Sequence, residues 1–236
     1  MKLMKPIGQP LSELSNFQEG QLILVNKPLE WTSFDVVNKI RIHLKKTLGI
    51  NKLKVGHAGT LDPLATGLLV VCTGKFTKRI EEIQNAEKEY TGTMVLGATR
   101  PSYDKETEID QTFKLDEVDE ESIKKAFQQH TGQIQQIPPI FSALKVNGTR
   151  AYKMARRNEK VTLKPKNIVV SIFEITELSL PKVAFRVVCS KGTYIRSLAH
   201  DVGRSLQNGA YLDSLCRTRI GDHSINHAMS LEELLK

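Results

Sequence analysis

The spacing of apolar and polar positions predicts four helices. Apolar side chains at Val36, Ile40, Leu44 and Leu48 recur every fourth residue, so they share one face of a helix. Thr32 or Ser33 suits its N-cap and Gly49 its end. Helices are also expected over residues 120–130 with Gly132 as C-cap, over residues 193–206, and after the capping box formed by Ser230 and Glu233.

Apolar or alternating runs predict strands between these helices. The expected strands cover residues 21–25, 68–72, 90–96, 167–178 and 183–189. Pro28 ends the first because proline has no N–H to offer a neighbouring strand, and residues 56–67 form a loop rich in Gly, Thr, Asp and Pro. Strands and helices mix without regular βαβ alternation, which favours an α+β fold. No long Pro/Gly/Ser linker interrupts the chain, so we expect a single domain over residues 1–236.

Composition excludes several protein classes. Of 236 residues, 40% are hydrophobic and 25% are charged, which is ordinary globular usage and argues against disorder. The longest apolar run, residues 68–72, is far below the roughly 20 residues needed to span a bilayer. An apolar signal-peptide core is absent near the N-terminus, so we expect a cytoplasmic protein. Cys72, Cys189 and Cys216 lack CxxC spacing, and we expect reduced core thiols.

The net charge of +8 is unevenly distributed along the chain. Residues 145–166 carry eight Lys or Arg against Glu159 alone, and residues 39–54 carry six with no acid. Conversely, residues 104–121 hold nine acids. Such clustering is typical of a protein that binds a polyanion. Residues 149–157 are too short and too basic for a membrane-surface helix. Charge therefore favours a nucleic acid as partner over a merely solvated helical face, and the chain has no helix-turn-helix or zinc-finger pattern for DNA.

Common catalytic motifs do not occur in the sequence. It contains no G-x-S-x-G, G-x-G-x-x-G or H-E-x-x-H. His223 and His227 have the spacing of half a zinc site but lack nearby further ligands, so no metal is predicted. What remains is Asp62, in the Gly-rich loop among small and apolar neighbours. A carboxylate placed there suits a nucleophile or general base, and it equally suits the closing of a turn.

The loop sequence Gly-His-Ala-Gly-Thr-Leu-Asp-Pro-Leu-Ala-Thr-Gly over residues 56–67 resembles the signature of the TruB family of tRNA pseudouridine synthases. Four further motifs match in family order, at residues 24–28, 88–90, 137–145 and 189–196. The resemblance covers roughly residues 20–220. It implies a mixed, mainly antiparallel sheet with flanking helices and a central RNA-binding cleft. It also implies isomerisation of uridine-55 in the T-loop of tRNA, without a cofactor.

The resemblance implies roles for three catalytic residues. Asp62 takes the place of the nucleophile, with attack at C1′ of the ribose or at C6 of the base left open. Tyr90 matches the tyrosine that lies against the flipped uracil and also handles a proton in one interpretation. Arg196 matches the arginine that pairs with the catalytic carboxylate and keeps it ionised.

The same resemblance implies the residues that contact RNA. His57 would occupy the space left by flipped bases, Tyr194 would be a second pocket aromatic, and Leu215 would line the uracil pocket. A thumb loop over about residues 138–166 would fold over the tRNA elbow. The remaining expected contacts are Lys27, Lys145, Arg150, Arg156 and Arg157.

This sequence departs from the family pattern at several places. Cys216 stands where an arginine is usual, residues 99–104 differ from the form Thr-x-Thr-x-Asp, and the thumb lacks the usual glycine around Asn158. The chain ends at Lys236, so no complete C-terminal PUA domain is expected. We expect a monomer that acts on the T-arm and elbow of tRNA. An RNA-binding protein without turnover is the alternative, and the intact Asp62 argues against it.

Overall fold

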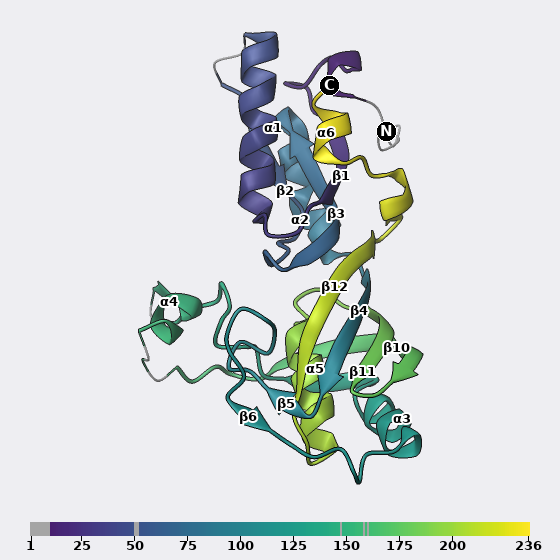
Figure 1. Ribbon diagram of the computed structural model, residues 1–236. Helices are drawn as coiled ribbons and strands as arrows, with labels where there is room; N and C mark the ends of the chain where they lie inside the picture. Colours follow the sequence, from purple (N-terminus) through teal and green to yellow (C-terminus); the bar gives the residue numbers. More distant parts are fainter. Residues whose placement is uncertain (1–9, 50–51, 147, 158, 160) are drawn as a thin grey trace. The chain divides into compact units, whose positions relative to one another are not determined.

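The computed structural model describes residues 10–49, 52–146, 148–157, 159 and 161–236 (Figure 1). Within it the chain forms two compact units. Unit 1 contains the described residues up to Tyr90 and those from Leu215 onward, and unit 2 contains residues 91–214. Strands β4 (Lys88–Leu96) and β12 (Ala210–Ile220) each continue from one unit into the other. The single catalytic domain, its thumb and the lack of a complete PUA domain stay predictions.

The sheet of unit 1 is built around β3 (Ala65–Thr73). β1 (Leu22–Lys27) and β2 (Val55–His57) pair with it antiparallel, and β12 pairs with it parallel through residues 215–217. Strand order in this unit is β1-β3-β12-β4, and β13 (His223–Ser224) pairs with β12. All residues of β3 except Thr66 are buried, as the continuous apolar run requires of a central strand.

Helix α1 (Ser33–Leu48) covers this sheet (Figure 1). Its predicted ends are confirmed, since Thr32 and Asp35 form a capping box and Gly49 adopts a left-handed φ of 62°. Val36, Ile40 and Leu44 are at most 1% exposed and join one apolar core with side chains of β1 and β3. The remaining short helices are η1 (Leu11–Glu13), η2 (Gly74–Arg79), α2 (Ile80–Asn85), η3 (Ile225–His227) and α6 (Leu231–Leu234). The predicted capping box of α6 is also confirmed.

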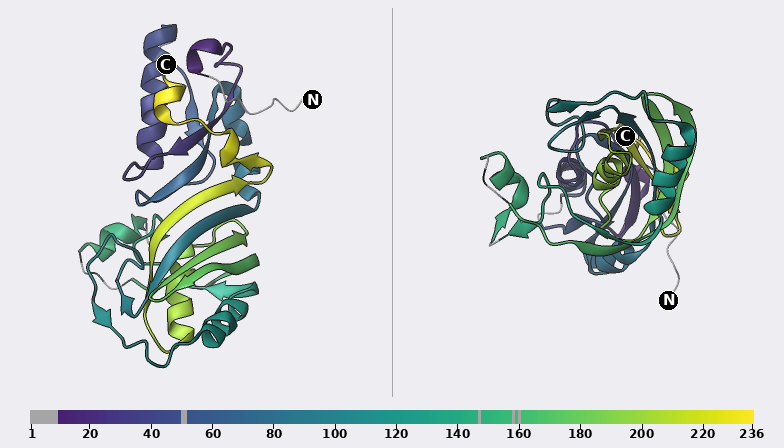
Figure 2. Two further views of the ribbon diagram at one scale, coloured as in Figure 1. Left: turned by 45° about the vertical axis from the view of Figure 1, so that its right-hand side comes forward. Right: turned by 90° about the horizontal axis from the view of Figure 1, so that it is seen from below.

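In unit 2 the strand order is β12-β4-β11-β10-β7. β10 (Lys166–Ser179) pairs antiparallel with both β11 (Lys182–Cys189) and β7 (Gly132–Gln136). Phe127 of α3 (Glu120–Gln129) stacks on Phe173 of β10 with ring centroids 4.1 Å apart. α5 (Ile195–Ser205) lies alongside the strands of this unit (Figure 2). Smaller elements are β5 (Ala98–Thr99), β6 (Gln111–Thr112), β8 (Lys145–Val146), β9 (Thr149–Arg150) and α4 (Ala151–Ala155).

The predicted α+β class and the mainly antiparallel sheet are confirmed, and some boundaries are corrected. The predicted loop at residues 56–67 is shorter, because its first residues pair in β2 and its last pair in β3. Gly132 is not the C-cap of α3; His130 is, and Gly132 begins β7 with a φ of 94°. The helix expected from residue 193 begins at Ile195. The sequence pattern did not predict strands β7 and β12.

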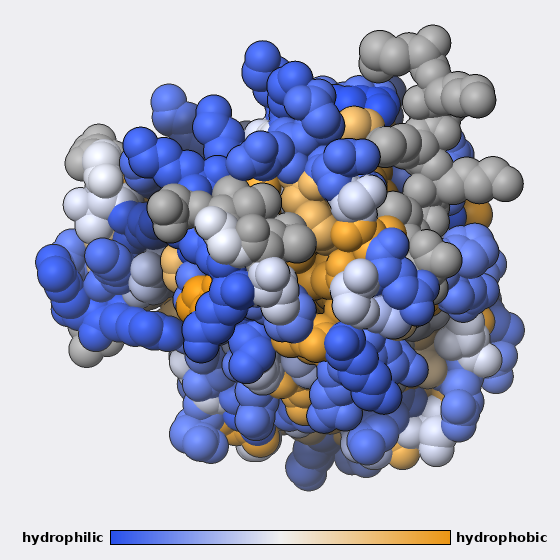
Figure 3. All heavy atoms as spheres, turned by 90° about the horizontal axis from the view of Figure 1, so that it is seen from above, coloured by the Kyte–Doolittle hydropathy of each residue, from blue (hydrophilic) through white to orange (hydrophobic). Residues whose placement is uncertain are grey.

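Side-chain burial follows the hydrophobic pattern. Hydrophilic side chains cover most of the face shown in Figure 3, around a smaller apolar area. Cys72 and Cys189 are buried free thiols, as expected, whereas Cys216 is only partly buried. Burial raises the pKa of Cys72 to about 11, so it stays a neutral thiol. None of the helices in the described part of the chain is long and apolar enough to cross a membrane.

Candidate active site

The Asp62 loop, residues 58–64, connects β2 to β3 in unit 1. Ala58 and Leu61 are buried, whereas Asp62 is partly exposed. The Ala58 N–H donates to the Val70 carbonyl at 2.8 Å, and the Ala65 N–H donates to the Asp62 carbonyl at 3.1 Å. The backbone of the loop is therefore fixed at both ends, while its carboxylate stands in a partly open position.

Ser33 fastens the loop to the first turn of α1. Its hydroxyl accepts a hydrogen bond from the Leu61 N–H at 2.8 Å and donates to the Leu61 carbonyl at 3.2 Å. The Ser33 side chain is 1% exposed. Because both polar groups of Leu61 are satisfied by one buried hydroxyl, the residue before Asp62 has little freedom to move.

Two buried cationic side chains, Lys27 and Arg217, donate hydrogen bonds to backbone carbonyls that precede and follow Asp62 in the sequence. Lys27 Nζ donates to the carbonyls of Pro28 at 2.8 Å, Trp31 at 2.6 Å and Pro63 at 3.3 Å. Arg217 donates to the carbonyls of Leu68 at 2.8 Å and Gly59 at 3.0 Å. Lys27 and Arg217 are at most 1% exposed. The sequence predicted no role for Arg217. Its support of the Asp62 loop becomes visible only through these contacts in the folded structure.

The charge of Asp62 bears on the ionisation of Lys27. Burial lowers the pKa of Lys27 to about 8, and the negative charge of Asp62 acts against that change. The ammonium group therefore stays mostly protonated near neutral pH. Binding of RNA by Lys27 stays a prediction, while its three carbonyl contacts give it a structural role beneath the loop.

His57 lies in β2, opposite Val71 of β3. Burial, and then the positive charge of Arg217, lower the pKa of His57, so the ring is neutral at pH 7. Within the described residues its Nδ1 atom is buried without a hydrogen-bond partner. A neutral ring suits the expected role of filling space against bases, which stays a prediction.

Tyr90 and Leu215 occupy the two neighbouring strands β4 and β12. Tyr90 is 8% exposed, and Leu215 pairs with Ala65 at the start of β3. The preceding residue, Glu89, accepts a hydrogen bond from the Thr218 hydroxyl at 2.8 Å. This contact fixes the start of β4 against β12, and with it the backbone that carries Tyr90.

In unit 2, Gln136 fixes the residue that caps α5. Its amide oxygen accepts from the Tyr194 N–H at 2.8 Å, and its amide nitrogen donates to the Tyr194 carbonyl at 3.0 Å. Gln136 is 1% exposed. The Ser197 hydroxyl also donates to the Ile137 carbonyl at 2.8 Å. The end of β7 thus holds the first turn of α5, which carries both Tyr194 and Arg196.

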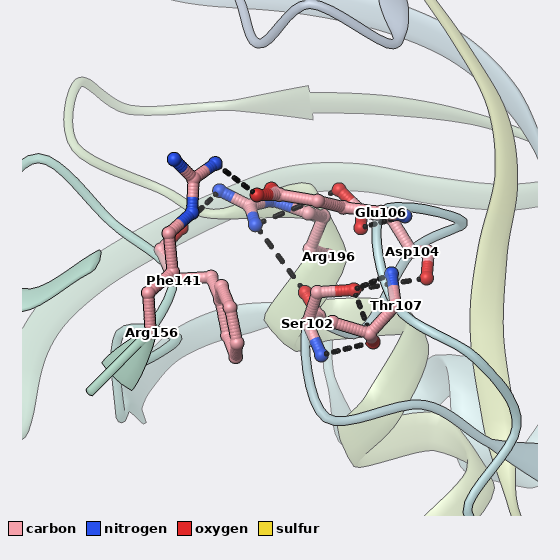
Figure 4. Close-up of polar contacts among 7 residues, drawn as sticks. All are labelled: Ser102, Asp104, Glu106, Thr107, Phe141, Arg156 and Arg196. Atoms are coloured by element: carbon pink, nitrogen blue, oxygen red, sulfur yellow. Dashed lines mark hydrogen bonds and ion pairs between the residues drawn. The ribbon is translucent and has the colours of Figure 1, made fainter. Parts of the chain in front are cut away.

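The Arg196 guanidinium is enclosed by polar groups of unit 2 (Figure 4). It donates to the carbonyls of Ser102 at 3.3 Å and Phe141 at 3.0 Å, and Nη1 lies 3.5 Å from Oδ2 of Asp104. Arg196 and Asp104 are at most 5% exposed. The sequence offered one signal for Asp104, because the atypical segment 99–104 still ends in aspartate. The expected pair of Arg196 with Asp62 stays a prediction, since these residues belong to different units.

The thumb carries exposed basic residues on a small folded element. Lys145 and Arg150 pair across the β8–β9 hairpin, and Arg150 donates to the Ala143 carbonyl at 3.1 Å. Arg156 forms an ion pair with Glu106 at 2.7 Å (Figure 4), and Arg157 lies 3.7 Å from Glu159. Their contacts with RNA stay predictions. Asn158, where the thumb departs from the family pattern, lies outside the described residues.

The chemistry available is that of a carboxylate, an aromatic hydroxyl and an arginine. In the part of the chain that the structure describes, no three His, Cys, Asp or Glu side chains come together as a metal site would require. The Asp62 loop and the first turn of α5 are each held by buried hydrogen bonds. The roles of Asp62 as nucleophile and of Arg196 as a supporting cation stay predictions.

Comparisons with known proteins cover nearly the whole chain. The model of the TruB family pseudouridylate synthase N-terminal domain matches residues 45–195. A protein of Phocaeicola vulgatus called tRNA pseudouridine synthase B is 54% identical over 92% of each chain. A Bacteroides fragilis protein of the same name is 55% identical over 91% of this chain and 92% of its own. A solved structure of a Cbf5-Nop10-Gar1 complex contains a chain that is 30% identical to this one, with a TM-score of 0.70. The match covers 99% of this chain and 60% of that chain. The family match and this breadth of identity assign the protein: the chain belongs to the TruB family of pseudouridylate synthases.

Proposed function

We propose that this protein is a tRNA pseudouridine synthase that isomerises uridine-55 in the T-loop, with Asp62 as nucleophile. The observation that carries the proposal is the fixed Asp62 loop in a member of this family. Ser33, Lys27 and Arg217 hold backbone on both sides of the carboxylate, which itself stays partly exposed. Relatives named tRNA pseudouridine synthase B share more than half of the sequence over most of both chains.

The reaction needs no external group. The bond between N1 of the uracil and C1′ breaks, a bond between C5 and C1′ forms, and the proton on C5 is exchanged for one on N1. Asp62 attacks either C1′ or C6, and the enzyme–substrate bond is broken again before product leaves. Oxidation and reduction do not occur, so no cofactor is part of the proposal.

Reaching the uridine requires that it leave the T-loop stack, at a cost of a few kcal/mol. We assign stacking against the extruded base to Tyr90 and Tyr194, with Leu215 beside the uracil. His57 would occupy the vacated space, and Arg196 would pair with Asp62 across the cleft that the family resemblance implies. The basic thumb would contact backbone phosphates, which supply most of the affinity for nucleic acid.

The proposal is tested by mapping pseudouridine in one purified, unmodified tRNA treated with the protein. We expect modification at position 55. Asp62→Ala and Asp62→Asn should form no product while binding tRNA within about tenfold of wild type, roughly 1.4 kcal/mol. Asp116→Ala, at an exposed aspartate, is the matched control. Product from Asp62→Ala in a single turnover would contradict the nucleophile, and binding without any product from wild type would favour an RNA-binding protein instead.

The finer part of the proposal is that a cytoplasmic monomer recognises the T-arm and elbow. An isolated T stem-loop should then be modified with kcat/KM within about tenfold of full-length tRNA, roughly 1.4 kcal/mol. A stem-loop that binds but reacts a hundredfold less efficiently would show that contacts beyond the T-arm are needed. Light scattering of the protein, with and without tRNA, tests the monomer.

A further inference from the structure

Tyr103 has an unusual backbone conformation beside the polar contacts of Arg196. Its φ is +63°, a left-handed value that costs a residue with a side chain about 1–3 kcal/mol. Such a conformation persists only where the surroundings enforce it. Tyr103 stands between Ser102 and Asp104, the two residues of this segment that contact Arg196.

The Tyr103 ring is held by a residue of the same helix that carries Arg196. It stacks on His200 with ring centroids 3.9 Å apart and an angle of 13° between the planes. His200 follows Arg196 by four residues in α5, so the two side chains lie on one face of the helix. The segment therefore meets α5 at two successive turns, through an ion pair at one and through stacked rings at the other.

Backbone contacts fix the same segment as well. The Leu212 N–H donates to the Tyr103 carbonyl at 2.9 Å, and Asp104 forms an isolated bridge with Leu212. The Tyr103 N–H donates to the Arg100 carbonyl at 2.9 Å. These bonds fix the Tyr103 peptide groups, while the ring stack fixes its side chain.

His200 is suited to packing rather than to proton transfer. Burial, and then the positive charge of Arg204, lower its pKa to about 4, so the ring is neutral at pH 7. Within the described residues its Nδ1 atom is buried and lacks a hydrogen-bond partner. Among the described residues the ring therefore has a stacking contact with Tyr103 on its face and no polar partner at Nδ1. Stacked aromatic pairs of this kind stabilise by about 0.5–1.5 kcal/mol.

We propose that Tyr103 and His200 are positioning residues for the isomerisation, and that their stack holds Asp104 in place as the partner of Arg196. This inference rests on the proposed function, since it assigns Arg196 to the reaction. It also accounts for the atypical segment 99–104, in which the left-handed turn at Tyr103 lets the aspartate still reach the arginine.

The test removes the ring contact and then restores it. Tyr103→Ala and His200→Ala are expected to lower the single-turnover rate at saturating tRNA about tenfold, equivalent to roughly 1.4 kcal/mol, with Kd for tRNA changed less than about threefold. Tyr103→Phe and His200→Phe keep two stacked rings and should react within about threefold of wild type. Phe34→Ala, which removes an exposed aromatic ring of α1, is the matched control and should leave the rate unchanged.

A purely structural role for the stack would lower the melting temperature but leave the rate of the folded alanine variants at the wild-type value, which would overturn the proposal. A crystal structure of Tyr103→Ala gives a readout that does not need activity. We expect the distance of 3.5 Å between Arg196 Nη1 and Asp104 Oδ2 to lengthen beyond ion-pair range. An unchanged distance would overturn the inference, whereas a wild type that makes no pseudouridine would overturn only the proposed function.

Discussion

Lys27 Nζ lies 3.3 Å from the carbonyl oxygen of Pro63, the residue that follows Asp62. The same ammonium group donates to the carbonyls of Pro28 and Trp31, so all three of its protons have backbone partners. A fully buried lysine is rare unless its charge is compensated. Here the compensation comes from carbonyl dipoles and the negative charge of Asp62, which couples the end of β1 to the candidate nucleophile.

Lys27→Met tests this coupling. Methionine fills similar space but leaves three carbonyl oxygens without their donor, and unsatisfied buried groups cost about 1–3 kcal/mol each. We expect lower stability in urea denaturation, and a single-turnover rate reduced at least about tenfold, roughly 1.4 kcal/mol. Lys78→Met, at an exposed lysine, is the control and should change neither. A variant that is less stable yet reacts at the wild-type rate would separate Lys27 from Asp62.

Gln136→Leu should affect α5 at its first turn. Both the N–H and the carbonyl of Tyr194 lose their partner, so we expect a loss of stability of about 1–3 kcal/mol. The rate should fall as well, because Arg196 follows two residues later on the same turn. Gln135→Leu, at the exposed neighbouring position of β7, is the matched control. Equal stability of the two variants in urea would show that the amide pair contributes nothing.

Tyr90→Phe separates the two roles left open for this residue. The ring is nearly buried in β4, so phenylalanine keeps the packing and the stacking surface while losing the hydroxyl. We expect tRNA binding to survive and single-turnover catalysis to fall sharply, because proton handling is lost. If Tyr90→Phe reacts almost as fast as wild type and only Tyr90→Ala is slow, stacking alone is the role of Tyr90.

The thumb arginines should act mainly on affinity. Replacing Arg150, Arg156 and Arg157 by glutamine is expected to weaken binding to every RNA tested. It should also flatten the slope of log affinity against log salt by up to about three units, fewer for any residue without a phosphate contact. Glu106→Gln should have the opposite effect, a modest tightening, because it releases Arg156 from its ion pair. Glu108→Gln, at a nearby exposed acid, serves as control. An unaltered slope would mean that these arginines face solvent in the complex.

Asp201 should make stability depend on pH. Burial raises the pKa of this carboxyl from 3.8 to about 6, so the folded state holds its proton more tightly than the unfolded state does. Its contribution is therefore fully present below pH 3.8 and is lost as pH rises toward about 6. We expect Asp201→Asn to be as stable as wild type in acid and more stable near neutral pH. Urea denaturation of both proteins across this pH range measures the difference between their free energies of unfolding. His200, whose lowered pKa has the opposite effect on stability, is present in both proteins, so its contribution cancels in that difference. A difference that does not change with pH would contradict the prediction.

The sequence by itself determined those helices and motifs whose signals come from residues close together in the chain. The four-residue spacing from Val36 to Leu44, with Thr32 before it and Gly49 after it, was enough to place α1 and both of its ends. Capping and helical periodicity involve residues within a turn or two, so they are written directly in the sequence. The motif around Asp62 likewise identified the family, because its residues are contiguous.

Only the tertiary structure decided which distant groups support those residues. The Ser102 carbonyl meets Arg196 across 94 positions of sequence, and Gln136 meets Tyr194 across 58. No local pattern specifies such pairs, because they depend on strand register and on how α5 packs. The same holds for Lys27, which the family resemblance placed among the expected RNA contacts. Folding buries it next to the Asp62 loop, where its charge is held by backbone carbonyls that approach only once β1, β3 and α1 have come together.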